Sequence, residues 1–117
     1  MKKSIIAIMS ALALAGCCEK NPLLQDFDTP FQTPPFDKIK VTDYMPAFER
    51  AVKEMKAEAE AIAASTDEAT FENTVVALEQ AGSRLTTISN IFFNLREACT
   101  SPEMDSVAVQ VQPMLTQ

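Results

Sequence analysis

Apolar side chains recur at three- and four-residue steps over three stretches of the chain, and each stretch predicts an amphipathic helix. Thr42 is the expected N-cap of the first helix, with Asp43 and Pro46 in its first turn and an end near Ala64. Ser101, Pro102 and Glu103 supply the start of the last helix, which Pro113 interrupts. The apolar positions are Tyr44, Phe48, Val52, Met55, Ala59 and Ile62 in the first stripe, and Met104, Val107 or Ala108, Val111 and Leu115 in the last.

The middle stripe continues across a glycine. Its positions are Phe71, Val75, Leu78, Leu85, Ile88, Phe92, Leu95 and Cys99. Thr70 can cap the helix, and Gly82 occupies the step between Leu78 and Leu85 in register with the stripe. A glycine that ends a helix is normally followed by a change of phase. We therefore predict one long helix from about Phe71 to Ala98, with a close helix approach or a mild kink at Gly82.

The segment before these helices is rich in both proline and apolar residues. Proline disfavours the helical conformation, so the sequence predicts an extended arm over residues 17–41. Its apolar residues are Leu23, Leu24, Phe27, Phe31, Phe36 and Ile39, too many for a solvated linker. We expect the arm to lie along a groove. A proline-rich recognition ligand at Thr33-Pro34-Pro35 is the alternative, although no flanking basic residue fits that pattern.

The first residues have the pattern of a targeting segment, and such a segment does not form part of the folded domain. Lys2 and Lys3 precede an apolar run from Ser4 to Ala15, and Leu14-Ala15-Gly16-Cys17 follows the pattern of a bacterial lipoprotein signal. Residues 1–16 are then a signal peptide, and Cys17 becomes the lipidated N-terminus. The apolar run is short for a membrane-spanning helix. These features predict a lipid anchor in the bacterial cell envelope; the alternative is a simple secretory signal in which Cys17 is incidental.

Charge and cysteine content limit the possible partners. Without residues 1–16, eight basic residues face sixteen acidic ones, a net charge of −8. No basic cluster is interleaved with aromatic residues, so nucleic-acid binding is disfavoured. A Cys18–Cys99 disulfide is allowed in an oxidising envelope, although it would tie a tether to a packed element. No Cys-x-x-Cys pair is present to form a redox motif or a thiolate zinc site.

The sequence offers no residue set that could catalyse a reaction alone. It contains no histidine, so neither a histidine zinc site nor a serine triad can be assembled. Its two glycines, Gly16 and Gly82, form no phosphate loop. The carboxylates on the helices are most simply a solvated face with i,i+4 partners. We predict no catalytic and no metal-binding residue. The predicted fold class is all-α: the arm followed by about three helices over residues 42–117, with stripes wide enough to expect further packing partners.

Several short motifs together resemble the N-terminal region of the zinc metallopeptidases that include thimet oligopeptidase, oligopeptidase A and bacterial peptidyl-dipeptidase. They are Asn21-Pro22-Leu23-Leu24, Phe31 to Phe36, Tyr44 with Pro46-Ala47-Phe48, Phe71-Glu72-Asn73-Thr74, Ala77-Leu78-Glu79, and Phe92 to Thr100. The opening motif and the lipoprotein signal look most like the peptidyl-dipeptidase branch. The resemblance implies two mainly helical halves around a deep channel. It also implies zinc in the far half and release of C-terminal dipeptides or cleavage of short oligopeptides.

Two interpretations follow from the resemblance. In the first, the chain is the N-terminal piece of a lipid-anchored zinc peptidyl-dipeptidase, contributes channel wall, and needs a missing C-terminal catalytic region that binds the zinc. In the second, it is a non-catalytic helical envelope lipoprotein that binds peptides or a protein partner. None of the family's metal ligands, nor its general-base glutamate, has a counterpart in residues 1–117.

Overall fold

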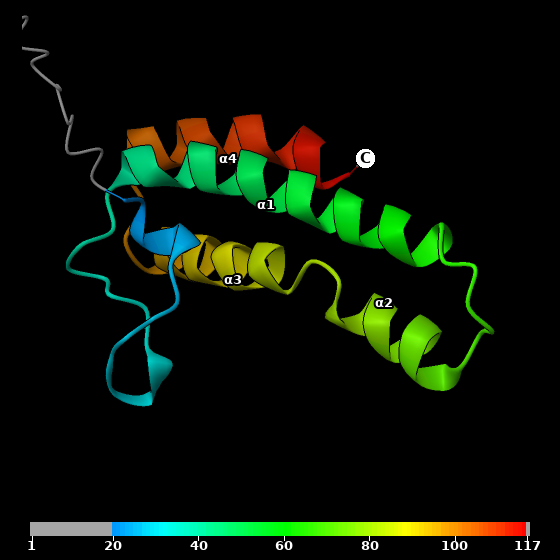
Figure 1. Ribbon diagram of the computed structural model, residues 1–117. Coiled ribbons are helices and arrows are strands. Elements are labelled where there is room, and N and C mark those ends of the chain that lie inside the picture. Colours follow the sequence, from blue (N-terminus) through cyan, green and yellow to red (C-terminus); the bar gives the residue numbers. More distant parts are fainter. Residues whose placement is uncertain (1–19, 117) are drawn as a thin grey trace, which may run out of the picture.

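The computed structural model describes residues 20–116, and this part of the chain contains helices and no strand, which confirms the all-α class. The main helices are α1 (Val41–Ala63), α3 (Ser83–Ala98) and α4 (Pro102–Leu115). A π-type turn, η3 (Phe71–Val76), leads into the short α2 (Ala77–Gln80). Figure 1 shows α1 packed between α3 and α4, with η3 and α2 beyond the end of α3.

The core lies where α1, α3 and α4 meet, and Phe92 is at its centre. The Phe92 ring makes edge contacts with Tyr44, Phe48 and Phe93, at centroid distances of 4.8, 5.5 and 5.1 Å. The buried apolar residues are Leu23 from the arm, Tyr44, Ala47, Phe48, Ala51 and Val52 from α1, Leu85, Ile88, Ile91 and Phe92 from α3, and Met104, Val107 and Val111 from α4. The first and last predicted stripes therefore form core over most of their length, although Ala59 and Ile62 are only half-buried and Leu115 is exposed.

The N-cap of α1 lies two residues before the predicted one. Lys40, not Thr42, occupies the N-cap position, and the helix begins at Val41. The carboxylate of Asp43 accepts a hydrogen bond from the Lys40 backbone N–H at 2.8 Å, which satisfies a donor just before the helix. Pro46 consequently lies in the second turn rather than the first. The end of the helix at Ala63, with Ala64 as C-cap, agrees with the prediction.

The break at Gly82 contradicts the single long helix predicted from Phe71 to Ala98. Gly82 adopts a left-handed backbone conformation with φ +75°, Ala81 before it is extended, and a new helix begins at Ser83. The Gly82 N–H donates to Oε2 of Glu58 on α1 at 2.8 Å. A Cβ atom at Gly82 would lie 2.8 Å from Cγ of Met55, so the expected close approach is present. The left-handed residue Gly82 changes the direction of the chain. The apolar positions keep their spacing in the sequence across it, so the periodicity alone does not reveal the break.

The two caps predicted for the later helices are confirmed. Thr70 Oγ1 accepts from the Asn73 N–H at 3.1 Å, and Asn73 Oδ1 accepts from the Thr70 N–H at 2.8 Å. Ser101 Oγ accepts from the Met104 N–H at 3.2 Å. The expectation that Pro113 interrupts the last helix is wrong, because α4 continues to Leu115. Pro113 lies in its last turn, where the missing N–H removes only one helical hydrogen bond.

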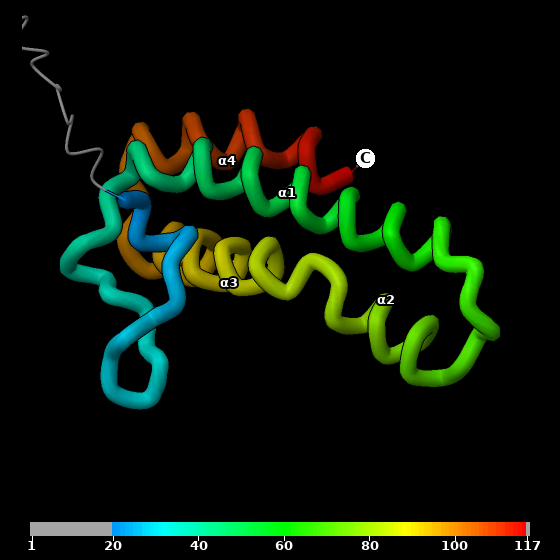
Figure 2. Tube along the Cα trace, viewed as in Figure 1, coloured from blue at the N-terminus to red at the C-terminus, as the bar shows by residue number. Residues whose placement is uncertain are grey.

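The arm packs on the core only in part. Leu23 is buried, Leu24, Phe27 and Ile39 are half-buried against the core, and two short 3₁₀ turns, η1 (Pro22–Leu24) and η2 (Pro30–Gln32), interrupt the extended path. Asn21 fixes its start by donating to the Asp43 carbonyl at 2.7 Å and accepting from the Leu23 N–H at 3.0 Å. Phe31 and Phe36, which we expected to be covered, are exposed. Figure 2 shows the arm loop extending below the helices, and Phe36 lines a hollow together with Ile91 and Leu95 of α3.

Candidate functional site

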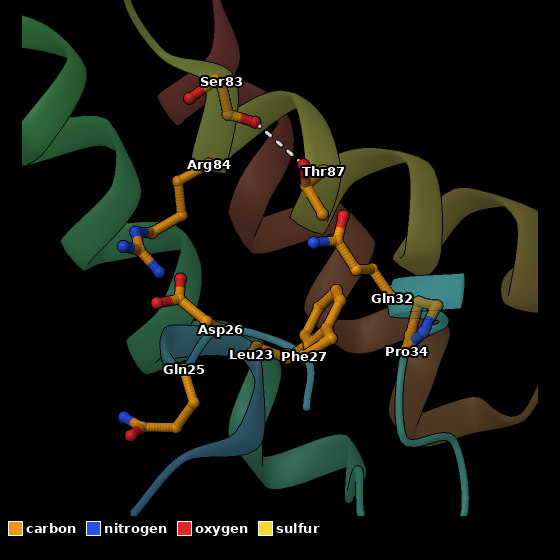
Figure 3. Close-up of a pocket in the computed structure, with 9 residues that line it drawn as sticks. All are labelled: Leu23, Gln25, Asp26, Phe27, Gln32, Pro34, Ser83, Arg84 and Thr87. Carbon is orange, nitrogen blue, oxygen red and sulfur yellow. Dashed lines mark hydrogen bonds between the residues drawn. The ribbon is translucent and has the colours of Figure 1, made fainter. Parts of the chain in front are cut away.

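A hollow lies where the arm crosses the first turns of α3. This arm groove has a volume of about 520 Å³. Its lining residues are Leu23, Gln25, Asp26, Phe27, Gln32, Pro34, Ser83, Arg84 and Thr87 (Figure 3). Polar groups from both elements surround the Phe27 ring, and the Arg84 guanidinium and the Asp26 carboxylate are turned toward each other. The groove therefore offers an apolar floor, amide groups and one charge of each sign.

Arg84 is held in place from α1. Its Nε lies 2.9 Å from Oε2 of Glu54, and the other carboxylate oxygen, Oε1, lies 2.6 Å from Nε of Arg50. The hydrogen bond from Arg50, with the nearby charge of Arg84, holds the pKa of Glu54 below its ordinary value. Glu54 thus links α1 to the first turn of α3. Arg84 is the sole basic residue between Lys56 and Arg96, a feature of the sequence that hydrophobic periodicity does not register.

We predict that Glu54→Gln destabilises the chain by about 0.2–1 kcal/mol at pH 7, the range for exposed ion pairs. Because the pKa of Glu54 is lower in the folded chain, its stabilising effect is present above the ordinary carboxyl pKa. That effect is lost as the pH falls through the folded pKa. Urea unfolding at pH 7 and pH 3 measures both values, with Glu60→Gln, an exposed α1 glutamate, as the control. A Glu54→Gln effect of equal size at pH 3 would contradict this assignment.

The described residues offer no catalytic centre. Residues 20–116 hold no group of three or more Cys, Asp or Glu side chains placed to bind a metal ion, and the sequence has no histidine. The arm groove is lined by polar and apolar side chains. It has no nucleophile paired with a base. The residues present do not fit a zinc site of the hydrolytic kind.

The one predicted modification site lies outside the described residues. Cys17 and Cys18 fall in residues 1–19, so neither the lipidation nor the Cys18–Cys99 pairing is tested by the structure. Cys99 is a free, exposed thiol after α3. Among the helices of residues 20–116, none is long and apolar enough to cross a membrane.

Comparison with curated proteins gives a consistent set of relatives. The chain is 40% identical over 84 residues to a dipeptidyl carboxypeptidase of Salmonella typhimurium, covering 72% of this chain and 12% of that protein. It is 35% identical over 97 residues to the dipeptidyl carboxypeptidase of Escherichia coli, covering 83% and 14%. The organellar oligopeptidase A of Arabidopsis thaliana is 33% identical over 93 residues, covering 80% and 11%. No family-wide sequence profile matches the chain.

The chain is thus matched along most of its length to three peptidases. The chain belongs to the thimet oligopeptidase and oligopeptidase A family. The resemblance drawn from the sequence motifs is thereby confirmed. The chain spans only 11–14% of the length of these relatives.

Proposed function

We propose that this chain is the N-terminal part of a zinc metallopeptidase of the peptidyl-dipeptidase type, which removes C-terminal dipeptides or cleaves short oligopeptides. The observation that carries the proposal is the 40% and 35% identity to two dipeptidyl carboxypeptidases over most of the chain. The chain's own part is structural. Its three packed helices form a wall of the channel through which peptides reach the catalytic region, and that region supplies the metal ligands.

The residues of this chain are consistent with a structural role, with catalysis left to another region of the peptidase. Zinc hydrolysis needs imidazole or thiolate ligands and an open position for water, and neither ligand type is available in a suitable group in residues 20–116. No catalytic step is therefore assigned to this chain. Its arm groove, with Arg84 beside Asp26, offers polar groups that an extended peptide could contact on the way.

The test is a chimera of the E. coli dipeptidyl carboxypeptidase in which residues 21–116 of this chain replace the matching segment. We expect the chimera to release C-terminal dipeptides in a chelator-sensitive way, and the 117-residue chain alone to release none. Stoichiometric zinc or chelator-sensitive cleavage in the isolated chain would contradict the proposal. So would a chimera that folds without activity, which favours the alternative of a non-catalytic lipoprotein whose arm groove binds peptides.

We also propose that Cys17 is the acylated N-terminus and holds the chain in the bacterial envelope. The support is the basic start, the apolar run and Leu14-Ala15-Gly16 directly before the cysteine. With two or three acyl chains, attachment should be stable. We expect Cys17→Ala to move the protein from the membrane fraction to the soluble fraction, with Cys18→Ala as the control that stays bound. Intact mass showing an unmodified Cys17 would rule out the anchor.

A further inference from the structure

The uncovered side of η3 and α2 is the least expected feature of the fold. Phe71, Val75 and Leu78 lie at i, i+4 and i+7, and their exposed fractions are 66%, 51% and 60%. We call these three residues the hairpin face. The same positions belong to the stripe that predicts core, yet no residue of η3 or α2 is buried. Three large apolar residues exposed within one short element are uncovered apolar surface of the kind that marks an interaction site.

The arm presents a second uncovered aromatic residue in a fixed loop. Phe31 is 98% exposed, and its φ of +60° lies in the left-handed region that non-glycine residues seldom adopt. Hydrogen bonds across the loop hold this conformation: the Gln32 N–H donates to the Thr29 carbonyl at 3.0 Å, and the Thr29 hydroxyl donates to the Thr33 carbonyl. An aromatic side chain held outward by its loop loses little conformational freedom when it binds.

In Figure 1 the backbone of the arm loop (cyan) and that of α2 (yellow-green) both lie below the layer of α1 and α4, at opposite ends of the molecule. Glu58, Glu60, Asp67, Glu68, Glu72 and Glu79 are the charged residues between Lys56 and Arg84, so this end of the chain carries acidic groups alone. A partner for the hairpin face should therefore combine apolar side chains with basic ones around them.

We propose that the hairpin face is the docking surface for the rest of the peptidase polypeptide, with Phe31 as an additional anchor. This inference rests on the proposed function. The occupant follows from the comparisons: the relatives carry the matched segment within chains of which it makes up only 11–14%. In such a chain the segment has a large body of polypeptide to pack against, and the exposed apolar side chains of the hairpin face are a surface that this body can cover.

The test measures whether the hairpin face becomes covered in the chimera with the E. coli peptidase. Leu78→Cys places a thiol on the face, and Lys53→Cys places one on the exposed polar side of α1 as a matched control. The rate of maleimide labelling at each position is followed by peptide mass spectrometry, in the free chain and in the chimera. We expect labelling at position 78 to slow by at least about tenfold in the chimera, the factor for a 1.4 kcal/mol cost of opening the docked face, and labelling at position 53 to be unchanged.

The outcomes separate the two proposals. An active chimera in which position 78 labels as fast as in the free chain overturns the docking surface and leaves the proposed function intact. An inactive or unfolded chimera overturns the proposed function and the docking surface with it. If position 78 is already slow in the free chain, and the slowing disappears on dilution, the face is covered by a second copy, and the proposal is likewise wrong. A charge variant adds an independent readout, since Leu78→Asp should speed thermal inactivation of the chimera, while Lys53→Asp should not.

Discussion

Replacing Phe92 with alanine is expected to destabilise the chain by about 3–5 kcal/mol, because the ring fills the centre of the core. Phe92 is fully buried, and its ring touches the aromatic residues Tyr44, Phe48 and Phe93 from two helices. Removal of the ring takes away these contacts and leaves a cavity between α1 and α3. Small domains typically have a total stability of about 5–15 kcal/mol, so the variant should lose a large part of it and unfold at a clearly lower temperature.

Far-UV circular dichroism during thermal unfolding measures this loss. The control is Phe36→Ala, which removes the same ring from a half-exposed position in the arm and should change stability by less than about 1 kcal/mol. A Phe92→Ala variant that unfolds at the wild-type temperature would show that the core does not close around this ring. A large effect of Phe36→Ala would instead show that the arm loop is packed in solution.

Gly82→Ala is expected to cost about 1–3 kcal/mol for two separate reasons. A left-handed backbone costs an alanine about 1–2 kcal/mol relative to glycine. The new methyl group would also lie 2.8 Å from Cγ of Met55, closer than carbon atoms can approach, so α1 or the Met55 side chain must shift. That shift also disturbs the hydrogen bond from the Gly82 N–H to Glu58. We expect the loss to appear in urea unfolding as a lower midpoint with an unchanged slope.

A double-mutant cycle with Met55→Ala separates the two causes. Truncation of Met55 removes the clash and leaves the backbone cost, so Gly82→Ala should be less damaging in that background by up to about 2 kcal/mol. If the two effects are simply additive, Met55 does not meet the new methyl group. If Gly82→Ala stabilises the chain, residues 71–98 form the continuous helix that the sequence spacing predicts, and the break at Gly82 is absent in solution.

The helices that sequence patterning predicted well are those with both a periodic stripe and a partner inside the chain. The stripes through Phe48 and through Val111 form core because α1 and α4 pack against each other, and Ser101 caps α4 as its side chain allows. The bounds of α1 shifted because Asp43 could satisfy the Lys40 N–H, which places the cap before Thr42. Competition between two local polar groups of this kind is not visible in a hydrophobic period.

Patterning failed where burial depends on something outside the local sequence. A period shows which residues share a face; it does not show what covers that face. Leu78 and Leu85 therefore fall on one predicted apolar stripe, although Leu78 is exposed and Leu85 is buried. The lack of room for a side chain at Gly82 comes from the close approach of Met55, which is distant in sequence. The arm groove was not predicted for the same reason, since it forms between the arm and α3, where Arg84 also contacts Glu54 of α1.

The two hydrogen bonds of Asn21 have a geometric consequence for a membrane-bound chain. They fix the start of the arm beside the first turn of α1. Four chain steps lead from Cys17 to Asn21, and a fully extended chain spans at most about 3.6 Å per residue, or about 14 Å. Acyl chains on Cys17 would therefore keep this end of α1 close to the bilayer surface. Lys20, Lys38 and Lys40, which line the hollow at that end together with Asp37 and Asp43, would then lie near the lipid headgroups.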